Sequence, residues 1–364
     1  MKKIKQLTIP SDTRVIVISD IHGELELFKE LLKKVDFNAD DYLIINGDLC
    51  EKGSNSKGVV SYVMDLVNHN PKVHVTEGNC DTLVDELINE NPKLIDYLLA
   101  RQKSIFNEWL AELDYTVSQQ STIEEVKQLL TRHYSRELDW VSNLPTAIET
   151  EHYIFVHAGL DKIDNWKNTD RETAVTIPAF MDKLHRAQKY VVVGHWPVIN
   201  YPTDVPTYNP IIDHEKKIIA IDGGNVIKST GQLNAFIIQH GVNQDDYSHV
   251  YTDYLANYKT VIKEFTADPS MTGSINWPDY TIIPVKQNEH FTLCEQPESS
   301  RFLYVKNEYI EQNEFGKYIA KSAIPCTQIS VNIGDIVSVI DDSCTGFNLI
   351  KKDGNTGWVS KTVF

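Results

Sequence analysis

Polar residues follow five short, largely apolar runs of the chain, each at the point where the run ends. The runs are RVIVIS, YLIIN, VHVT, YIFV and YVVV, and Asp-Ile-His, Gly-Asp, Gly-Asn, His and Gly-His come directly or almost directly after them. Short runs rich in β-branched residues are typical of buried strands. Because ligands of an open α/β sheet bind beyond the carboxyl ends of its strands, the five polar clusters are expected to meet along one edge.

Helical patterns separate these runs in the first two-thirds of the chain. Residues 23–35 repeat apolar side chains at helical spacing, and a second helix is expected near 59–67. The expected strands are Arg14–Asp20, Tyr42–Asp48, Val73–Asn79, Tyr153–Val156, Tyr190–Val193, Ile218–Ile221 and Leu233–Ile238. This alternation predicts an α/β fold with helices on the faces of a largely buried sheet.

Three further segments complete the expected organisation. Residues 81–142 are amphipathic without a strand pattern, which predicts a helical cap inserted into a domain of residues 1–242. Residues 243–278 are polar and interrupted by proline and glycine, as in a linker or wrapping segment. Residues 279–364 contain short β runs and turn signals, and the Asp-Gly of KKDGNTGW favours a tight hairpin. A small β domain is therefore expected at the C-terminus.

Net charge and composition limit the kinds of partner and the location that can be expected for this protein. The formal net charge of −16 argues against a nucleic acid or an anionic membrane as the main partner, because both require clustered Lys and Arg. No stretch approaches the roughly 18 apolar residues of a membrane span, and the N-terminus lacks the pattern of a secretory signal. The five cysteines are odd in number and lack CxxC spacing. A cytoplasmic location is the simplest expectation.

The polar clusters together supply two aspartates, one asparagine and three histidines. They are Asp20, Asp48, Asn79, His22, His157 and His195. Mixed oxygen and nitrogen ligands suit Mn, Fe, Zn or Co better than Ca. Two such ions need a bridging anion, a role that the carboxylate of Asp48 would fill, and water held between them becomes a nucleophile at neutral pH. Each motif alone is more often a helix cap or a turn, so the hypothesis of a metal-dependent phosphoester hydrolase depends on all five occurring in order.

The motifs DIHGE, GDLCEKG, GNCD, VHAGL and GHWP resemble those of the calcineurin-like metallophosphoesterases, and within them the bacterial relatives of the phosphoprotein phosphatase family. The resemblance covers about residues 14–240. It implies a four-layer α/β/β/α sandwich with two divalent transition-metal ions, Mn, Fe or Zn. Asp20, His22 and Asp48 would hold one ion, and Asp48, Asn79, His157 and His195 would hold the other.

Two departures from the family's pattern concern the catalytic positions. The family's general acid is the histidine of GNHE, paired with the second aspartate of GDxVDRG, and here these positions carry Cys80 and Glu51. An ordinary thiol, with a pKa of about 8.5, is a poorer match for this task than an imidazole. The alternative is that Cys80 only packs, which would favour good leaving groups such as aryl phosphates or anhydrides. Lys52 replaces the family's phosphate-binding arginine and, with Asn79, is expected to contact substrate.

Several functions stay open at this point. The leading interpretation is a phosphomonoesterase acting on phosphoproteins or small phosphoesters. The alternatives are a nucleotide phosphodiesterase or dinucleoside polyphosphate hydrolase, and a catalytically weak scaffold that binds phosphopeptides. The C-terminal sequence resembles the bacterial SH3-like domains that end in a GWV strand, which implies a small β-barrel and a peptide or protein partner.

Overall fold

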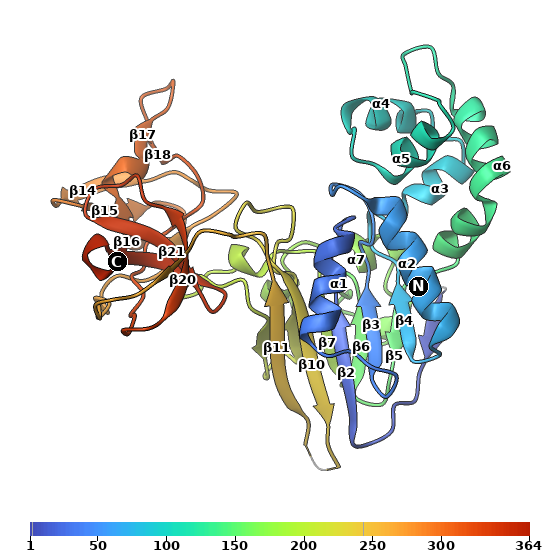
Figure 1. The fold of residues 1–364 in the computed structure, drawn as a ribbon, viewed down its shortest axis with the longest axis horizontal. Coiled ribbons are helices and arrows are strands. Elements are labelled where there is room, and N and C mark those ends of the chain that lie inside the picture. The colour runs from blue at the N-terminus through green and yellow to red at the C-terminus, as the bar shows by residue number, and fades with distance from the viewer. Residues whose placement is uncertain (2, 243) are drawn as a thin grey trace. The chain divides into compact units, whose positions relative to one another are not determined.

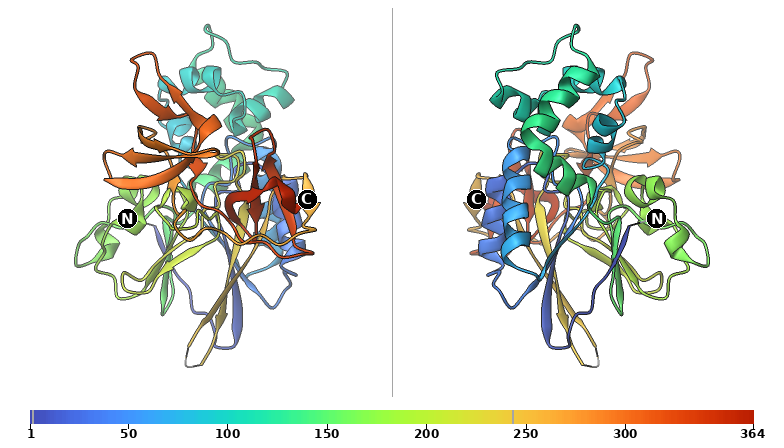
Figure 2. Two further views of the ribbon diagram at one scale, coloured as in Figure 1. Left: turned by 90° about the vertical axis from the view of Figure 1, so that its left-hand side faces the viewer. Right: turned by 90° about the vertical axis from the view of Figure 1, so that its right-hand side faces the viewer.

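The computed structural model of the chain describes residues 1, 3–242 and 244–364, and Figures 1 and 2 show its ribbon. These residues form two compact units. The first comprises Met1–Val198 and Pro210–Asp253, and the second comprises Ile199–Asn209 and Tyr254–Phe364.

The first unit is built on two β-sheets. One has the strand order β11-β10-β2-β3-β4, and the other has the order β1-β5-β6-β7-β9-β8. The strands of the first sheet are β11 (Asp246–Thr252), β10 (Leu233–His240), β2 (Thr13–Ile18), β3 (Tyr42–Asn46) and β4 (Val73–Thr76). Those of the second are β1 (Ile4–Gln6), β5 (Ala147–Glu149), β6 (Tyr153–Val156), β7 (Tyr190–Val193), β9 (Ile218–Ala220) and β8 (Ile211–Asp213). Because β2, β3 and β4 run parallel to one another, as do β6, β7 and β9, the carboxyl ends of each set share an edge.

Alternate residues of the strands divide the apolar core into two layers. Val17 of β2, Phe155 of β6 and Val192 of β7 belong to a buried cluster that joins the two sheets. Ile16 and Ile18 of β2 instead join the cluster formed with the helices. The period of two along a strand thus lets one strand serve both layers.

Helices α1 (Leu25–Lys34) and α2 (Ser56–His69) bury their apolar stripes in the second cluster. Leu27, Phe28 and Leu31 of α1 lie at helical spacing and are fully or almost fully buried. The side chain of Asn55 caps α2 by accepting a hydrogen bond from the backbone N–H of Gly58. Both helices lie where the sequence pattern predicts helices.

Four helices occupy the segment for which the sequence predicts a helical cap. They are α3 (Leu83–Ile88), α4 (Lys93–Ala100), α5 (Ile105–Glu112) and α6 (Ile123–Ser142). Thr122 and Glu125 form a capping box at the start of α6, with each side chain bonded to the other's backbone N–H. The helical content predicted for residues 81–142 is confirmed. A shorter helix, α7 (Arg171–Thr176), follows β6.

The second unit consists mainly of strands. Its sheets have the orders β12-β20-β21-β22, β14-β15-β16, β13-β19 and β17-β18. The strands are β12 (Tyr258–Thr260), β13 (Ser274–Ile275), β14 (Ile283–Gln287), β15 (Phe291–Gln296), β16 (Arg301–Lys306), β17 (Ile310–Gln312), β18 (Tyr318–Ala320), β19 (Ile324–Pro325), β20 (Ile336–Asp341), β21 (Phe347–Lys352) and β22 (Asn355–Ser360). The predicted hairpin is confirmed, because Lys352 pairs with Asn355 across Asp353 and Gly354, both of positive φ.

Residues 243–278, for which the sequence predicts a linker or wrapping segment, contain three of these strands. β11 pairs with β10 in the first unit, whereas β12 pairs with β20 and β13 with β19 in the second. The structure shows an α/β unit and a separate strand-rich unit, while the four-layer arrangement and the closed SH3-like barrel stay predictions. Among the described residues, no helix combines the length and the apolar character needed to cross a bilayer.

Candidate metal centre

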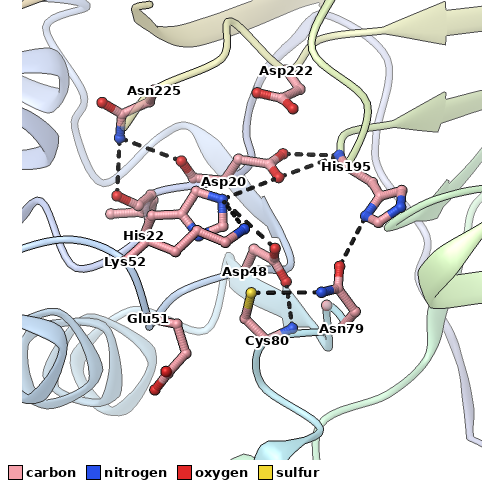
Figure 3. A network of polar contacts seen from close by, with 12 residues as sticks. Asp20, His22, Asp48, Glu51, Lys52, Asn79, Cys80, His195, Asp222 and Asn225 are labelled. Atoms are coloured by element: carbon pink, nitrogen blue, oxygen red, sulfur yellow. Dashed lines mark hydrogen bonds and ion pairs between the residues drawn. The ribbon is translucent and has the colours of Figure 1, made fainter. Parts of the chain in front are cut away.

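The residues that follow β2 and β3 meet those that follow β6 around the carboxylate of Asp48. Asp48 Oδ2 lies 3.7 Å from Nε2 of His22, and Asp48 Oδ1 lies 3.4 Å from Nε2 of His157. Asp20 Oδ1 lies 3.8 Å from the same nitrogen of His22. All four side chains are almost completely buried. Asp48 therefore stands between the two imidazoles, at the centre of the cluster in Figure 3.

Asn79 and His195 extend this cluster. Asn79 Oδ1 lies 3.2 Å from Nε2 of His157 and 2.8 Å from Nδ1 of His195. The backbone N–H of His195 donates to Asp20 Oδ2 over 3.1 Å. The structure thus brings together all six side chains that the sequence predicts as metal ligands.

Each imidazole is oriented through its other nitrogen. Nδ1 of His157 lies 3.0 Å from the carbonyl oxygen of Asn46, and Nε2 of His195 lies 3.1 Å from that of Thr176. Nδ1 of His22 lies 3.4 Å from the carbonyl oxygen of Cys50. When the nitrogen facing the carbonyl carries the proton, the nitrogen facing the cluster is left with a free lone pair. Metal-binding histidines are commonly oriented by such contacts.

Four of these six residues have backbone angles that side chains rarely adopt. The φ angles are +57° at Asp20, +50° at His22, +55° at Asp48 and +65° at His195. Left-handed φ values cost roughly 1–2 kcal/mol for most residues other than glycine, and less for Asp, Asn and His, which adopt them more often. Such strain concentrates at functional sites, where the surrounding structure enforces it. The strands β2 and β3 consequently end before their polar residues, earlier than the sequence predicts, and β4 likewise ends at Thr76 rather than at Asn79.

Glycines 78 and 194 allow the chain to pass close to the carboxylates. A Cβ atom on Gly78 would lie 2.2 Å from Asp48 Oδ1, and one on Gly194 would lie 2.3 Å from Asp20 Oδ2. Side-chain carbons do not approach oxygen atoms this closely. Glycine at these two positions therefore lets the backbone pass directly beside the carboxylates of Asp48 and Asp20.

The electrostatics of the cluster are those of a site for cations. Burial disfavours charge on His157, but the carboxylates of Asp48 and Asp20 outweigh this effect and raise its pKa to about 10. Burial also disfavours charge on Asp48, yet the neighbouring His157 holds the pKa of Asp48 well below its ordinary range. Burial and the charge of His157 lower the pKa of His195 to about 4. Fixed negative charge is therefore compensated in part by a proton on His157, which a divalent cation would displace.

The donor set fits two metal ions. Asp20, Asp48 and His157 form one group of potential ligand atoms that all lie within 4.8 Å of one another, and His22 and Asp48 form a second such group with Cys80, which is not among the six predicted ligands. Asp48 belongs to both groups, as a bridging ligand must. Carboxylate, amide and imidazole donors together suit Mn, Fe or Zn.

Two further predicted residues, Lys52 and Cys80, reach the cluster. Lys52 Nζ lies 3.3 Å from Nε2 of His22. Burial alone would lower the pKa of Lys52, but the negative charge around it, including Asp48 and Asp20, raises it. Burial, and next the charge of Asp48, raises the pKa of the Cys80 thiol well above its ordinary value. The structure thus places a cationic ammonium group and a neutral thiol beside the predicted ligands.

Glu51 is the predicted catalytic residue whose side chain the structure does not bring to the cluster. Its fully buried carboxylate turns away from Cys80 (Figure 3) and accepts hydrogen bonds from Tyr97, Ser104 and Ile105 in the helical segment. The pairing with residue 80 that the resemblance implies is absent, because three donors hold the carboxylate elsewhere.

Sequence reasoning missed several polar residues that support the cluster. Asp81 accepts hydrogen bonds from the backbone N–H groups of Asp48, Leu49 and Gly78, and so joins the loops after β3 and β4. Asn225 Nδ2 donates to the carbonyl oxygen of Ile21 over 3.0 Å. Asp81 lies in the GNCD motif and was within reach of motif reasoning.

Asp222 and Asn46 are also part of this surrounding shell. Asp222 is buried, and burial followed by the charge of Asp20 raises its pKa well above the ordinary value. Asn46 Nδ2 donates to the carbonyl oxygens of Val156 and Val192 and so joins the two sheets beneath the site. Asp222 and Asn225 lie in IDGGN, between two of the expected strands, and Asn46 lies within a strand pattern.

Comparisons with known proteins agree with this geometry. A family model described as calcineurin-like phosphoesterase matches residues 13–217. A symmetrical bis(5'-nucleosyl)-tetraphosphatase from Buchnera aphidicola subsp. Acyrthosiphon pisum is 33% identical over 134 residues, which cover 35% of this chain and 46% of that protein. The asymmetrical bis(5'-nucleosyl)-tetraphosphatase PrpE of Bacillus thuringiensis is 24% identical over 217 residues, covering 52% of this chain and 84% of that protein. The match thus spans about half the length of the first of these curated relatives.

Solved structures include a serine/threonine phosphatase from Saccharomyces cerevisiae that is 15% identical with a TM-score of 0.44. That match covers 70% of this chain and 84% of the yeast chain.

An α/β unit with carboxylate, amide and imidazole side chains converging at the ends of its parallel strands defines a metal-binding hydrolase fold. The chain belongs to the calcineurin-like phosphoesterase family, whose members use two-metal sites.

Proposed function

We propose that this protein is a metal-dependent hydrolase that cleaves phosphate compounds with good leaving groups. The observation that carries this proposal is the position of Asp48, one of whose carboxylate oxygens lies 3.7 Å from His22 Nε2 and the other 3.4 Å from His157 Nε2. In the proposed site, Asp20, His22 and Asp48 would hold one divalent ion, and Asp48, Asn79, His157 and His195 would hold the other. When bound, two such ions supply an activated water molecule and neutralise charge on the phosphoryl group.

The chain's own residues complete the site in this proposal. The Lys52 ammonium group, held beside His22, binds the anionic phosphoryl oxygens and neutralises part of their charge. It does so as a point charge rather than with the two-pronged geometry of arginine. The Asn79 side chain has its oxygen directed toward His157 and His195, and the amide nitrogen toward Cys80.

Two observations support a preference for good leaving groups. The side chain at position 80 is a buried thiol of raised pKa, which donates a proton less readily than an imidazolium group. The Glu51 carboxylate, the other expected member of the acid pair, is bonded to the helical segment. Phosphoanhydrides and aryl phosphates need little proton donation because their leaving groups are already weak bases.

A second candidate is hydrolysis of dinucleoside polyphosphates, which are phosphoanhydrides. The names of the two bis(5'-nucleosyl)-tetraphosphatases favour this candidate over a protein phosphatase. Phosphomonoester hydrolysis, including that of phosphoproteins, stays open as the first expectation from the sequence. The SH3-like role of the second unit, its peptide or protein partner and the cytoplasmic location also stay proposals.

The test compares three substrates with the Mn-loaded protein: para-nitrophenyl phosphate, its bis-ester and a dinucleoside tetraphosphate. Metal-dependent turnover that disappears in Asp48→Asn is expected, with the tetraphosphate or the aryl monoester cleaved fastest. Equal weak activity in the wild type and Asp48→Asn would reject hydrolysis at this site and favour the phosphopeptide-binding scaffold. Cleavage of the bis-ester alone would reject both the monoesterase and the tetraphosphatase in favour of a phosphodiesterase.

A further inference from the structure

Glu51 caps a helix that begins 54 residues further along the chain. Its Oε1 atom accepts hydrogen bonds from the Ser104 hydroxyl group over 3.0 Å and from the backbone N–H of Ile105 over 2.9 Å. Its Oε2 atom accepts one from the Tyr97 hydroxyl group over 2.8 Å. Ser104 is the N-cap of α5, where backbone N–H groups lack partners within the helix. A carboxylate satisfies such a group and is also favoured by the positive end of the helix dipole.

Glu108 makes the reverse contact. It lies in the first turn of α5, and its carboxylate accepts hydrogen bonds from the backbone N–H groups of Ser56 over 2.9 Å and Lys57 over 2.8 Å. These two residues begin α2. The first backbone N–H of α5 thus donates to Glu51, in the loop before α2, and the first backbone N–H groups of α2 donate to Glu108 of α5. We call Glu51 and Glu108, with these hydrogen-bond donors, the reciprocal clamp.

The loop between β3 and α2 needs such support. The φ angles of Glu51 and Lys52 are +71° and +70°, so two consecutive residues without glycine's freedom hold the left-handed conformation. The backbone N–H of Lys52 donates to the carbonyl oxygen of Lys103, just before α5, over 3.1 Å. The same residue extends its ammonium group to within 3.3 Å of Nε2 of His22. Hydrogen bonds to the helical segment thus flank the residue that reaches the candidate metal centre.

We propose that Glu51 is a positioning residue, which together with Glu108 latches the helical segment of residues 83–142 onto the loop and holds Lys52 over the phosphoryl site. This inference rests on the proposed function, because it assigns Lys52 to the binding of substrate oxygens. It gives the buried carboxylate a role that does not involve proton transfer. It also gives the helical segment a role in the site, since the segment fixes the position of a binding residue without touching the substrate.

Limited proteolysis tests the reciprocal clamp independently of activity. Arg101 and Lys103 lie in the exposed loop before α5, so trypsin can cut there, and fragment masses identify the cuts. Loss of the clamp in Glu51→Ala is expected to raise the rate of these cuts about tenfold, as the loss of hydrogen bonds to a buried charge implies. Glu51→Gln should have a smaller effect, because its remaining oxygen still accepts from Ser104 and Ile105. The matched control is Glu124→Gln, a change of an exposed carboxylate in the first turn of α6, within the same helical segment but away from the clamp.

A double-mutant comparison tests the link to Lys52. In the Mn-loaded protein, Glu51→Ala and Lys52→Ala should each raise both the KM for para-nitrophenyl phosphate and the inhibition constant of inorganic phosphate about tenfold, with a smaller change in kcat. The double variant should resemble Lys52→Ala alone, because a misplaced ammonium group and a missing one are equivalent. Glu108→Gln should change the same constants in the same direction and so replaces Glu51→Ala should that variant not fold.

The outcomes separate the two ideas. Rates of tryptic cleavage before α5 that are equal in Glu51→Ala and the wild type would overturn the role of the reciprocal clamp. Additive effects of Glu51→Ala in the Lys52→Ala background would overturn the positioning of Lys52. A wild type that neither hydrolyses the substrate nor binds phosphate would overturn the proposed function and the positioning role with it, while the proteolysis would still report on the reciprocal clamp.

Discussion

Replacing Gly78 by alanine should disable the candidate metal centre and also lower the stability of the fold, because the new side chain would clash with backbone as well as with a ligand. Gly78 has no positive φ, so its backbone accepts an alanine. The new Cβ atom, however, would lie 2.2 Å from Asp48 Oδ1 and 2.3 Å from the backbone nitrogen of Asp48. Because Cβ contacts below 3.0 Å essentially never occur, the distance to Asp48 Oδ1 has to lengthen by at least 0.8 Å and that to the backbone nitrogen by at least 0.7 Å, so the carboxylate and the backbone of the two loops both shift.

This displacement sets the size of the expected effect. Metal–ligand distances tolerate errors of about 0.2 Å, and a misplacement of about 1 Å in a catalytic site costs roughly 100-fold in rate. We expect Gly78→Ala to weaken binding of Mn²⁺ by about 10- to 100-fold and to lower kcat/KM for para-nitrophenyl phosphate by about 100-fold. Calorimetric titration of the metal-free protein measures the first change, and initial rates at saturating Mn²⁺ measure the second.

The control is Gly316→Ala in the second unit, where a new Cβ atom meets nothing within 4 Å. Its φ of +74° makes this change costly to stability by about 1 kcal/mol, but metal binding should not change. Urea unfolding of both variants separates stability from binding. Wild-type affinity for Mn²⁺ in a folded Gly78→Ala protein would refute the close approach of Gly78 and Asp48 as the reason for the glycine.

Three other changes give further expected outcomes. Cys80→His supplies an imidazole where the family has its acid, so turnover of alkyl phosphates should rise more than that of aryl phosphates; an unchanged ratio of the two rates contradicts the role given to position 80. Burial and the neighbouring Lys5 lower the pKa of His74 to about 4, so the unfolded chain binds a proton near pH 6.5 that the folded chain takes up only near pH 4. Stability should therefore fall as the pH drops through this window, by up to about 3 kcal/mol, and urea titrations of His74→Gln should show a shallower fall than those of the wild type. Trp358 is fully buried in the second unit, with its Nε1 atom donating to the carbonyl oxygen of Pro325, so Trp358→Ala should lower the free energy of unfolding by about 3–5 kcal/mol; a loss below about 1 kcal/mol in urea unfolding would contradict this packing.

The sequence predicts the meeting of the six polar side chains because parallel strands place their carboxyl ends together. The bounds of β6 and β7 agree with the sequence pattern, and His157 and His195 follow them as predicted. The ends of β2 and β3 differ, because Asp20 and Asp48 adopt a left-handed conformation that no periodicity reveals. Local pattern therefore locates the ligands but not the backbone geometry that directs them.

The environment of Glu51 could not be predicted in the same way. Its partners Tyr97, Ser104 and Ile105 lie 46 to 54 residues further along the chain, in helices whose docking depends on long-range packing. The amphipathic pattern of that segment predicts helices but not which carboxylate they contact. Asp222 and Asn225 escaped notice for a related reason, since a Gly-rich turn beside a strand gives no sign of the neighbours it meets in the folded chain.

The left-handed backbone at four of the proposed ligands has a consequence for how this protein tolerates heat and mutation. Asp and His adopt this conformation more readily than most side chains, so each of these residues opposes folding by at most about 1–2 kcal/mol. The substitution Asp20→Gly or Asp48→Gly would remove this backbone strain and, at the same time, a proposed metal ligand. A screen that selects only for thermal resistance should therefore enrich such inactive variants. Residues that the proposed chemistry requires are thus among those whose replacement would raise the stability of the fold.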